Sequence, residues 1–146
     1  MEFIIREAEP KDAPVIVQLI AALAASSSEH SPLTESYVLG YLSTSAGTIL
    51  LAELQGNIVG MLSYSLRPDL YHAAKSCLIE ELVVCDDKRG QGVGSALIAE
   101  LYSRLSSQDC AEVSLAVMPD NTGAIRFYKR HGLTDEAIFL ENHFPR

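Results

Sequence analysis

Three glycines at alternate positions, Gly90, Gly92 and Gly94, follow an apolar run that ends at Val84. The run is rich in residues that favour β-strands, whereas apolar side chains recur at helical spacing from Ala96 onward. A strand, a glycine loop and a helix N-terminus together offer unpaired backbone N–H groups and a partial positive charge. Because glycines let an anion approach the backbone, this stretch predicts a binding site for a pyrophosphate.

Composition narrows the class of protein that carries this site. The chain has 146 residues, of which 48% are hydrophobic and 21% are charged, as expected for one folded domain over residues 1–146. The net charge of −8 argues against a nucleic-acid partner, because binding to phosphates needs clustered cations. An acidic surface would suit a cationic substrate, although in many proteins it serves solubility alone.

Cysteine usage and hydropathy predict a reducing setting without a membrane. Cys77, Cys85 and Cys110 are odd in number and lack CxxC spacing, so we expect neither a disulfide framework nor a metal site. The near-apolar stretch 13–25 is shorter than the roughly 20 residues that a membrane-spanning helix needs. The N-terminus also lacks a basic leader. We therefore expect a cytoplasmic protein with no membrane partner and no metal.

The periodicity of the chain switches repeatedly between strand and helix. Strand-like runs occupy residues 3–9, 48–54, 58–66, 77–84, 112–117 and, in the tail, 133–144. Helical spacing covers residues 10–25, 31–42, 91–107 and 119–132, where Gly132 is well placed to end the last helix. These patterns predict a mixed α/β domain without repeats or linkers.

Two other classes of glycine-rich phosphate loop do not match. A P-loop requires GxxxxGK[ST], which the chain lacks, and a Rossmann fingerprint requires GxGxxG, whereas the spacing here is GxGxG. The acid that would bind a ribose about 20 residues later falls near Glu112, at the start of a strand instead of its end. Both classes are therefore excluded.

The loop does match another pattern. Arg89-x-x-Gly92-x-Gly94 has the form Q/R-x-x-G-x-G/A, and Asn121-x-x-Ala124 leads into Phe127-Tyr128 near the C-terminus. With residues 5–12 and 79–84, these motifs make nearly the whole chain resemble the GNAT superfamily of N-acetyltransferases. The resemblance implies a mixed, mostly antiparallel central sheet of six to seven strands, flanked by four helices and splayed between the fourth and fifth strands.

The resemblance also implies acetyl-coenzyme A as donor and a primary amine as acceptor, either a small molecule or, as the second choice, a protein amine. Matched by position, the residues that would cradle the pyrophosphate are Arg89, Gly90, Gln91, Gly92, Val93, Gly94 and Ser95. The residues that would hydrogen-bond the pantetheine arm are Leu82 and Val84, through their backbones, and Asn121 from the other side. No metal is implied.

Two side chains carry the chemistry that the resemblance implies. An alkylamine has a pKa near roughly 10.4, so it must lose a proton before it attacks a thioester. Glu80 matches the position of a catalytic glutamate, although a β-bulge would disturb the alternation of the strand, so Glu81 or a water remains an alternative base. Tyr128 would lie near the sulfur and protonate the leaving thiolate, although its helical spacing with Ala124 also fits simple core packing.

Some alternatives remain open at this point. A non-catalytic acetyl-coenzyme A sensor would keep the same cradle, and pairing of the tail or of exposed helices would give a homodimer. Asp86 and Asp87 stand where many relatives have a proline, which puts acidic charge near a dianionic ligand. Among the histidines, His72 is the best placed, because the loop before the fourth strand often borders the acceptor site in this superfamily.

Overall fold

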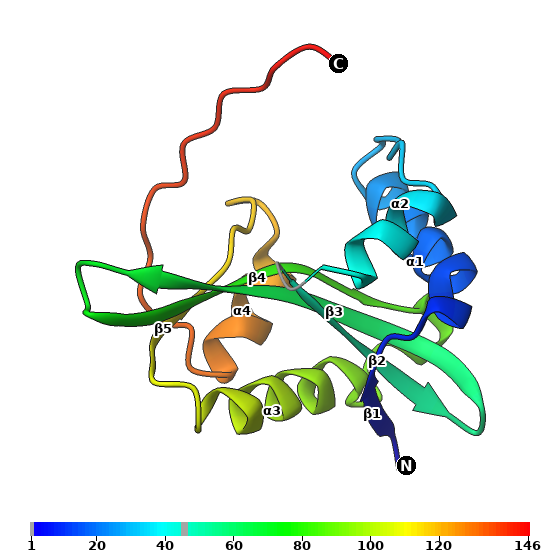
Figure 1. Ribbon diagram of the computed structural model, residues 1–146, viewed down its shortest axis with the longest axis horizontal. Helices are drawn as coiled ribbons and strands as arrows, with labels where there is room; N and C mark the ends of the chain where they lie inside the picture. Colours follow the sequence, from blue (N-terminus) through cyan, green and yellow to red (C-terminus); the bar gives the residue numbers. More distant parts are fainter. Residues whose placement is uncertain (1, 45–46) are drawn as a thin grey trace.

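The computed structural model describes residues 2–44 and 47–146. A five-stranded sheet crosses its centre in the order β1-β2-β3-β4-β5 (Figure 1). Neighbouring strands are antiparallel except for β4 and β5, which are parallel. The strands are β1 (Ile4–Glu7), β2 (Thr48–Leu54), β3 (Asn57–Asp69), β4 (Ala74–Val84) and β5 (Cys110–Ser114).

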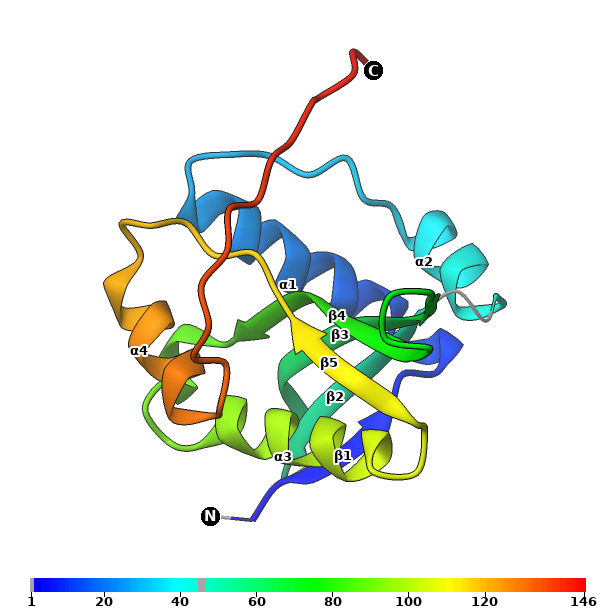
Figure 2. The same ribbon diagram turned by 90° about the vertical axis from the view of Figure 1, so that its left-hand side faces the viewer.

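Helices cover both faces of this sheet (Figures 1 and 2). One face carries α1 (Ala13–Ser26) and α2 (Glu35–Leu42), and the other carries α3 (Val93–Leu105) and α4 (Thr122–Arg130). Two short 3-10 helices, η1 (Pro10–Asp12) and η2 (Asp86–Lys88), lie before α1 and after β4. The expected mixed, mostly antiparallel α/β fold with four α-helices is confirmed.

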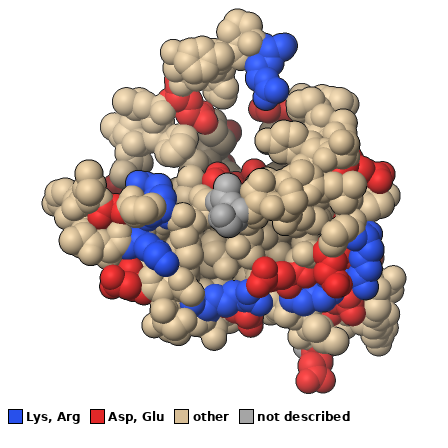
Figure 3. Space-filling model, viewed as in Figure 1, with Lys and Arg blue, Asp and Glu red and all other residues tan. Residues whose placement is uncertain are grey.

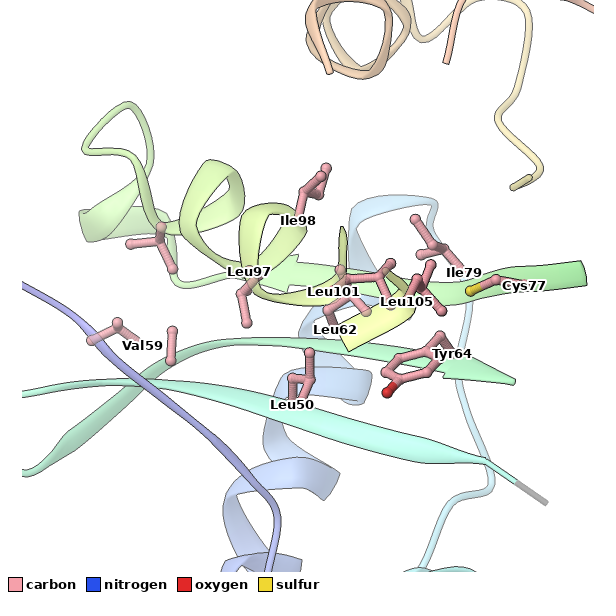
Figure 4. Packing of buried hydrophobic residues seen from close by; sticks show 12 residues of the cluster. Leu50, Val59, Leu62, Tyr64, Cys77, Ile79, Leu97, Ile98, Leu101 and Leu105 are labelled. Atoms are coloured by element: carbon pink, nitrogen blue, oxygen red, sulfur yellow. The ribbon is translucent and has the colours of Figure 1, made fainter. Parts of the chain in front are cut away.

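Alternation along the strands separates two hydrophobic clusters. Leu50 and Leu62 face α3, whereas Leu51 and Met61, their chain neighbours, face α1 and α2. Figure 4 shows the first cluster, in which side chains of α3 pack onto those of the central strands. Because β2, β3 and β4 are covered on both faces, their core residues are almost completely removed from water, and this burial stabilises the fold.

The turn after β2 and the end of α4 both depend on residues with positive φ. The hairpin between β2 and β3 turns at Gln55 and Gly56, both with positive φ, as a tight two-residue hairpin requires. The last helix ends as predicted, because Gly132 adopts φ +90° and lets Leu133 donate its N–H to the carbonyl of Tyr128 at 3.1 Å.

The second helix begins later than the sequence predicted. Its cap is Thr34, whose side-chain oxygen accepts the N–H of Tyr37 at 3.1 Å. The hydroxyl of Ser31 instead accepts the N–H of Leu33 at 3.2 Å, which forms a local turn in the linker after α1. The predicted start at Ser31 is therefore wrong, because the serine closes a turn and the threonine caps the helix.

The expected count of six to seven strands is wrong, because five are found in residues 2–44 and 47–146. The tail 133–146 contains no strand and extends away from the body of the protein (Figures 1 and 2). Ile138 and Leu140 are each 87% exposed there. β-like composition expresses a fit to a half-buried sheet surface, and without a neighbouring strand it does not form a strand by itself.

Candidate active site

The parallel ladder between β4 and β5 is short. Its last pair joins Leu78 to Ser114, and β4 continues to Val84. Within the described residues, no strand pairs with β4 beyond Leu78 on the edge that faces β5. The splay expected between the fourth and fifth strands is therefore an open strand edge six residues long.

The backbone groups that face this open edge follow from the register of β3 and β4. Cys85 donates its N–H to the carbonyl of Val59 at 2.9 Å, which fixes one hydrogen-bonded pair of the ladder. In an antiparallel ladder such pairs alternate with pairs whose N–H and C=O groups point away from the partner strand. Leu82 and Val84 belong to the second kind, so their backbone donors and acceptors point toward the open edge.

The glycine loop leads from this edge to an uncapped helix. Gly90 and Gly92 adopt φ +76° and +89°, a region that L-residues rarely occupy. Gly92 is the N-cap of α3, and none of the side chains that the structure describes caps this helix. The first-turn N–H groups therefore remain for a ligand, and Val93, only 1% exposed, can contribute only its backbone.

Two predicted cradle residues also connect α3 to α4. A Cβ at Gly94 would lie 3.0 Å from the ring of Phe127, so glycine is needed there for the two helices to approach. The hydroxyl of Ser95 lies 3.0 Å from Nε2 of His131, at the end of α4. Gly94 thus serves helix packing, and Ser95 has a protein partner for its hydroxyl.

Two polar side chains of the glycine loop make contacts within the loop itself. Arg89 forms an ion pair with Asp86 at 3.2 Å, and Gln91 donates to the carbonyl of Asp87 at 3.1 Å. The Arg89 and Asp86 side chains are 63% and 93% exposed, so Arg89 can also reach toward an anion. The acidic pair that departs from the family pattern is thus partly neutralised within the loop.

A β-bulge lies in β4 between Ile79 and Glu81. Glu81 pairs with Ser63 and Ile79 pairs with Tyr64, so Glu80 is the extra residue on its strand. The bulge that the sequence analysis left open is therefore present. It breaks simple alternation, which would have put Glu80 and Glu81 on opposite faces.

Both carboxylates contact serines on one face of the sheet. Glu81 accepts a hydrogen bond from the hydroxyl of Ser63, and Ser63 accepts the N–H of Glu81 at 3.1 Å. Glu80 is exposed and accepts a hydrogen bond from the hydroxyl of Ser65 at 3.2 Å. Ser63 and Ser65 lie two and four residues after Met61 in β3, so they share the face that α1 and α2 cover. The two acids therefore concentrate negative charge on that face.

A cavity of about 250 Å³ lies between α1, α2 and the sheet. Its lining includes Glu81, the only acid among the described residues that form its wall. Burial, reinforced by the negative charges of Glu81 and Glu80, raises the pKa of Tyr41 in the same wall. Figure 3 shows that the surface is hollowed between the tail and α2, with acidic atoms at the bottom of the hollow.

Tyr128 and Asn121 lie on α4 and at its start. Tyr128 packs partly buried against the α3-side cluster, as do Leu82 and Val84, and burial raises its pKa. Its phenol therefore stays protonated well above neutral pH. Asn121 caps α4 by accepting the N–H of Ala124 at 3.2 Å, which leaves its amide N–H₂ group as a donor. Among the described residues no hydrogen bond joins Tyr128 to either glutamate.

His72 does not border this site. It lies in the turn between β3 and β4, and from Ala74 to Glu80 the strand covers roughly 20 Å at about 3.3 Å per residue. Asp69 holds the His72 ring at 2.5 Å and also accepts a hydrogen bond from Ser76. Ligand atoms of Asp69, His72 and Glu112 lie within 4.8 Å of one another, but the hydrogen bonds of the turn account for the Asp69–His72 contact.

Comparison with known proteins agrees with this geometry. Residues 16–133 match the model of a family described as "Acetyltransferase (GNAT) family". The chain belongs to the GNAT family. The resemblance inferred from the sequence is thereby confirmed. The family match also confirms that the protein belongs to a class of acetyltransferases. No helix in the part of the chain that the structure describes is both long and apolar enough to cross a membrane.

Three similar proteins give the degree of similarity. L-2,4-diaminobutyric acid acetyltransferase of Nocardia farcinica is 28% identical over 110 residues, or 68% of this chain and 55% of that protein. Aminoalkylphosphonate N-acetyltransferase of Salmonella typhimurium is 29% identical over 142 residues, or 96% of this chain and 86% of that protein. A crystal structure of a transcriptional regulator from Bacillus halodurans superimposes with a TM-score of 0.85 at 28% identity, covering 98% and 100% of the two chains.

Two residues of this GNAT site were not singled out from the sequence. Ser63 was missed because it is 18 residues from Glu81 in the sequence, and their contact depends on the register between β3 and β4. Tyr41 falls within the helical spacing of residues 31–42, and it lies on the apolar side of α2. Its proximity to the two carboxylates follows from how α2 packs on the sheet, which the periodicity of the helix does not specify.

Proposed function

We propose that this protein transfers an acetyl group from acetyl-coenzyme A to a primary amine by direct attack in a ternary complex. The observation that carries the proposal is the open edge of β4 at Leu82 and Val84, which runs directly into the glycine loop and the uncapped N-terminus of α3. An extended amide-bearing arm that ends in a pyrophosphate is complementary to an open strand edge followed by an anion site.

The donor side of the proposal assigns roles to backbone groups. Leu82 and Val84 would bind the pantetheine arm as an added strand, and the amide of Asn121 would donate to it from the opposite side. The residues that would surround the pyrophosphate are Arg89, Gly90, Gln91, Gly92, Val93, Gly94 and Ser95, largely through their N–H groups. When bound, acetyl-coenzyme A supplies the acetyl group as a thioester.

The acceptor side uses the two carboxylates. An ammonium group is attracted to Glu80 and Glu81 and gives up one proton to a carboxylate, directly or through one water, before its nitrogen attacks. The sequence favours Glu80 as this base. The wall of the cavity includes Glu81, and we therefore propose Glu81 as the group that contacts the amine, with Glu80 at the mouth.

Tyr128 would complete the reaction as a general acid. When the carbon–sulfur bond breaks, the thiolate receives the phenolic proton. The ammonium nitrogen loses two protons in all: the first goes to the carboxylate before the attack, and the second leaves as the amide forms and restores the phenol of Tyr128. A raised pKa supports this role, because it keeps the phenol protonated across the physiological range. Buried packing of Tyr128 alone would also explain the raised pKa, so substitution of the hydroxyl is the decisive test.

A small-molecule acceptor is supported by the relatives and by the cavity. Two relatives are named for small amines, L-2,4-diaminobutyric acid and aminoalkylphosphonate. The cavity of about 250 Å³ is smaller than the ~300–1,000 Å³ typical of sites for drug-sized ligands. The three free cysteines fit a reducing compartment, and we propose the cytoplasm as the location.

The expected homodimer also remains a proposal. β5 is an edge strand of the sheet, and the tail exposes Ile138, Leu140 and Phe144 to solvent. Pairing of one tail with β5 of a second copy would cover both. Analytical ultracentrifugation of the intact chain tests this arrangement, since a strictly monomeric protein at micromolar concentration would rule it out.

Release of free thiol from acetyl-coenzyme A, followed across a panel of amines, tests the proposed activity. We expect release with at least one class of amine, and Tyr128→Phe should lower kcat about 10²-fold or more without weakening coenzyme binding. The alternative is an acetyl-coenzyme A sensor. Saturable coenzyme binding without thiol release, with every small amine and with peptide amines, would favour the sensor and refute the enzyme.

A further inference from the structure

We infer that the acceptor is a small primary amine on an uncharged, apolar group, as opposed to an amine that also carries a carboxylate or a phosphonate. This inference rests on the proposed function, because it specifies the acceptor class for the same site. It is drawn from the lining of the cavity between α1, α2 and the sheet, which contains Glu81.

The walls of this cavity are largely hydrocarbon. They come from α1, the linker after it, α2 and three central strands. The aliphatic members are Ile16, Ile20, Leu33, Val38, Ile49 and Met61. An apolar substituent that enters such a cavity leaves water and gains free energy in proportion to the area it buries. A negatively charged substituent in the same place would lose its hydration without gaining a cationic partner.

Two polar side chains of the wall, Ser31 and Ser63, already have partners within the protein. The hydroxyl of Ser31 accepts the N–H of Leu33, and the hydroxyl of Ser63 is engaged with Glu81. The groups left for a ligand are the Glu81 carboxylate and the phenols of Tyr37 and Tyr41. The cavity therefore offers one strong contact, to a cation, and few further polar contacts.

The charge of the lining disfavours a ligand that carries an anionic group in addition to its ammonium group. None of the described residues that form the wall is Lys, Arg or His. A carboxylate or phosphonate held there would find no cationic partner and would be repelled by Glu81 and by Glu80 on the same face. Charge thus selects for the ammonium group and against a distant acid on the same molecule.

A set of amines of matched length tests this selection. With acetyl-coenzyme A saturating, we expect kcat/KM for pentylamine to exceed that for δ-aminovalerate and aminopropylphosphonate by at least about tenfold. Along the series from propylamine to pentylamine, each methylene should raise kcat/KM about three- to fourfold, which corresponds to ~0.8 kcal/mol per buried methylene. Equal or higher kcat/KM for the acidic amines would overturn the inference.

A charge introduced into the wall should shift the preference. Leu33→Arg places a cation beside the cavity. We expect this variant to lower the ratio of kcat/KM for pentylamine to kcat/KM for δ-aminovalerate by about tenfold. Leu39→Arg is the matched control, because Leu39 is an exposed residue of α2 outside the lining, and its ratio should equal that of the unaltered protein. The same shift in both variants would point to general surface charge and would contradict the inference.

Binding measured without turnover separates this inference from the proposed function. Calorimetric titration of pentylamine and δ-aminovalerate into the complex with coenzyme A reports acceptor preference even in a protein that transfers no acetyl group. Preferential binding of pentylamine, weakened by Glu81→Gln, would support the inference. Thiol release that favours acidic amines would leave the enzyme intact and refute the acceptor class alone.

Discussion

Ser63 and Glu81 hold each other across the β3–β4 ladder by two hydrogen bonds. The Ser63 hydroxyl donates to the Glu81 carboxylate and accepts the Glu81 N–H at 3.1 Å. Ser63 is only 2% exposed, so its hydroxyl has no access to competing water. The pair fixes the carboxylate at the point where the strand bulges and the cavity begins.

Removal of the Ser63 hydroxyl should therefore act on the acceptor and leave the donor unaffected. We expect Ser63→Ala to lower kcat/KM for the amine about tenfold, the equivalent of one lost hydrogen bond of ~1.4 kcal/mol, with unchanged affinity for acetyl-coenzyme A. Ser65→Ala removes the corresponding contact of Glu80 and is the matched control, with a loss of about threefold or less. Equal losses in both variants would contradict a special role of Ser63.

The two adjacent carboxylates should differ in their effect on rate. Glu81→Gln keeps the shape of the side chain but removes the base, and we expect kcat to fall about 10²-fold or more. Glu80→Gln should cost less, because Glu80 is exposed and Glu81 lines the cavity. Steady-state rates with one amine decide between them, and the reverse order would assign the base to Glu80 as the sequence suggested.

Gly94 should be required for stability as well as for the loop. A methyl group there would press on the ring of Phe127 at 3.0 Å, and we expect Gly94→Ala to lower the free energy of unfolding by about 1–3 kcal/mol. Gly123→Ala is the control, since a Cβ at this helical position meets nothing within 4 Å and should be neutral or slightly stabilising. Urea unfolding measures both, and a Gly94→Ala protein as stable as the control would refute the packing argument.

Acid should weaken the link between β1 and the start of α1. Hydrogen bonds from Arg6, at 2.8 and 3.0 Å, lower the pKa of Asp12, which is 6% exposed. A lowered pKa in the folded state means that this contribution is complete above the ordinary carboxyl pKa of about 3.9 and is lost as pH falls below it.

Asp12→Asn tests this pH dependence. We expect the variant to lose about 2 kcal/mol of unfolding free energy at pH 7 and to show a smaller further loss between pH 5 and pH 3 than the unaltered protein. Denaturant titrations at several pH values provide the comparison. Parallel pH profiles for the two proteins would show that Asp12 does not carry this part of the acid sensitivity.

Much of the fold could be predicted because local patterns and tertiary packing agree. The strand-like run at residues 48–54 forms β2, and Gly132 follows the last helix with the positive φ that ends it. The glycine loop could likewise be located, because spacing and conformational freedom are properties of the sequence itself. The functional family followed from these motifs together.

The remaining features depend on partners that are distant in the sequence. The bulge at Glu80 arises from the register of β4 against β3, and alternation alone placed Glu80 and Glu81 on opposite faces. Tail residues such as Ile138 favour strands, but a strand requires an edge to pair with, and the tail pairs with none in the described chain. The acceptor cavity combines residues of α1, the linker after it, α2 and the strands β2, β3 and β4, and of these only β4 carries a family motif.

Hydrogen exchange at the open edge of β4 tests the central claim most directly. In the free protein, the amides of Leu82 and Val84 face away from β3 and should exchange quickly, whereas that of Val83 lies in the ladder and should already be protected. With saturating acetyl-coenzyme A, we expect exchange at Leu82 and Val84 to slow at least about tenfold and exchange at Val83 to change little. Saturated coenzyme binding with no change at Leu82 and Val84 would contradict the proposal that this edge holds the donor.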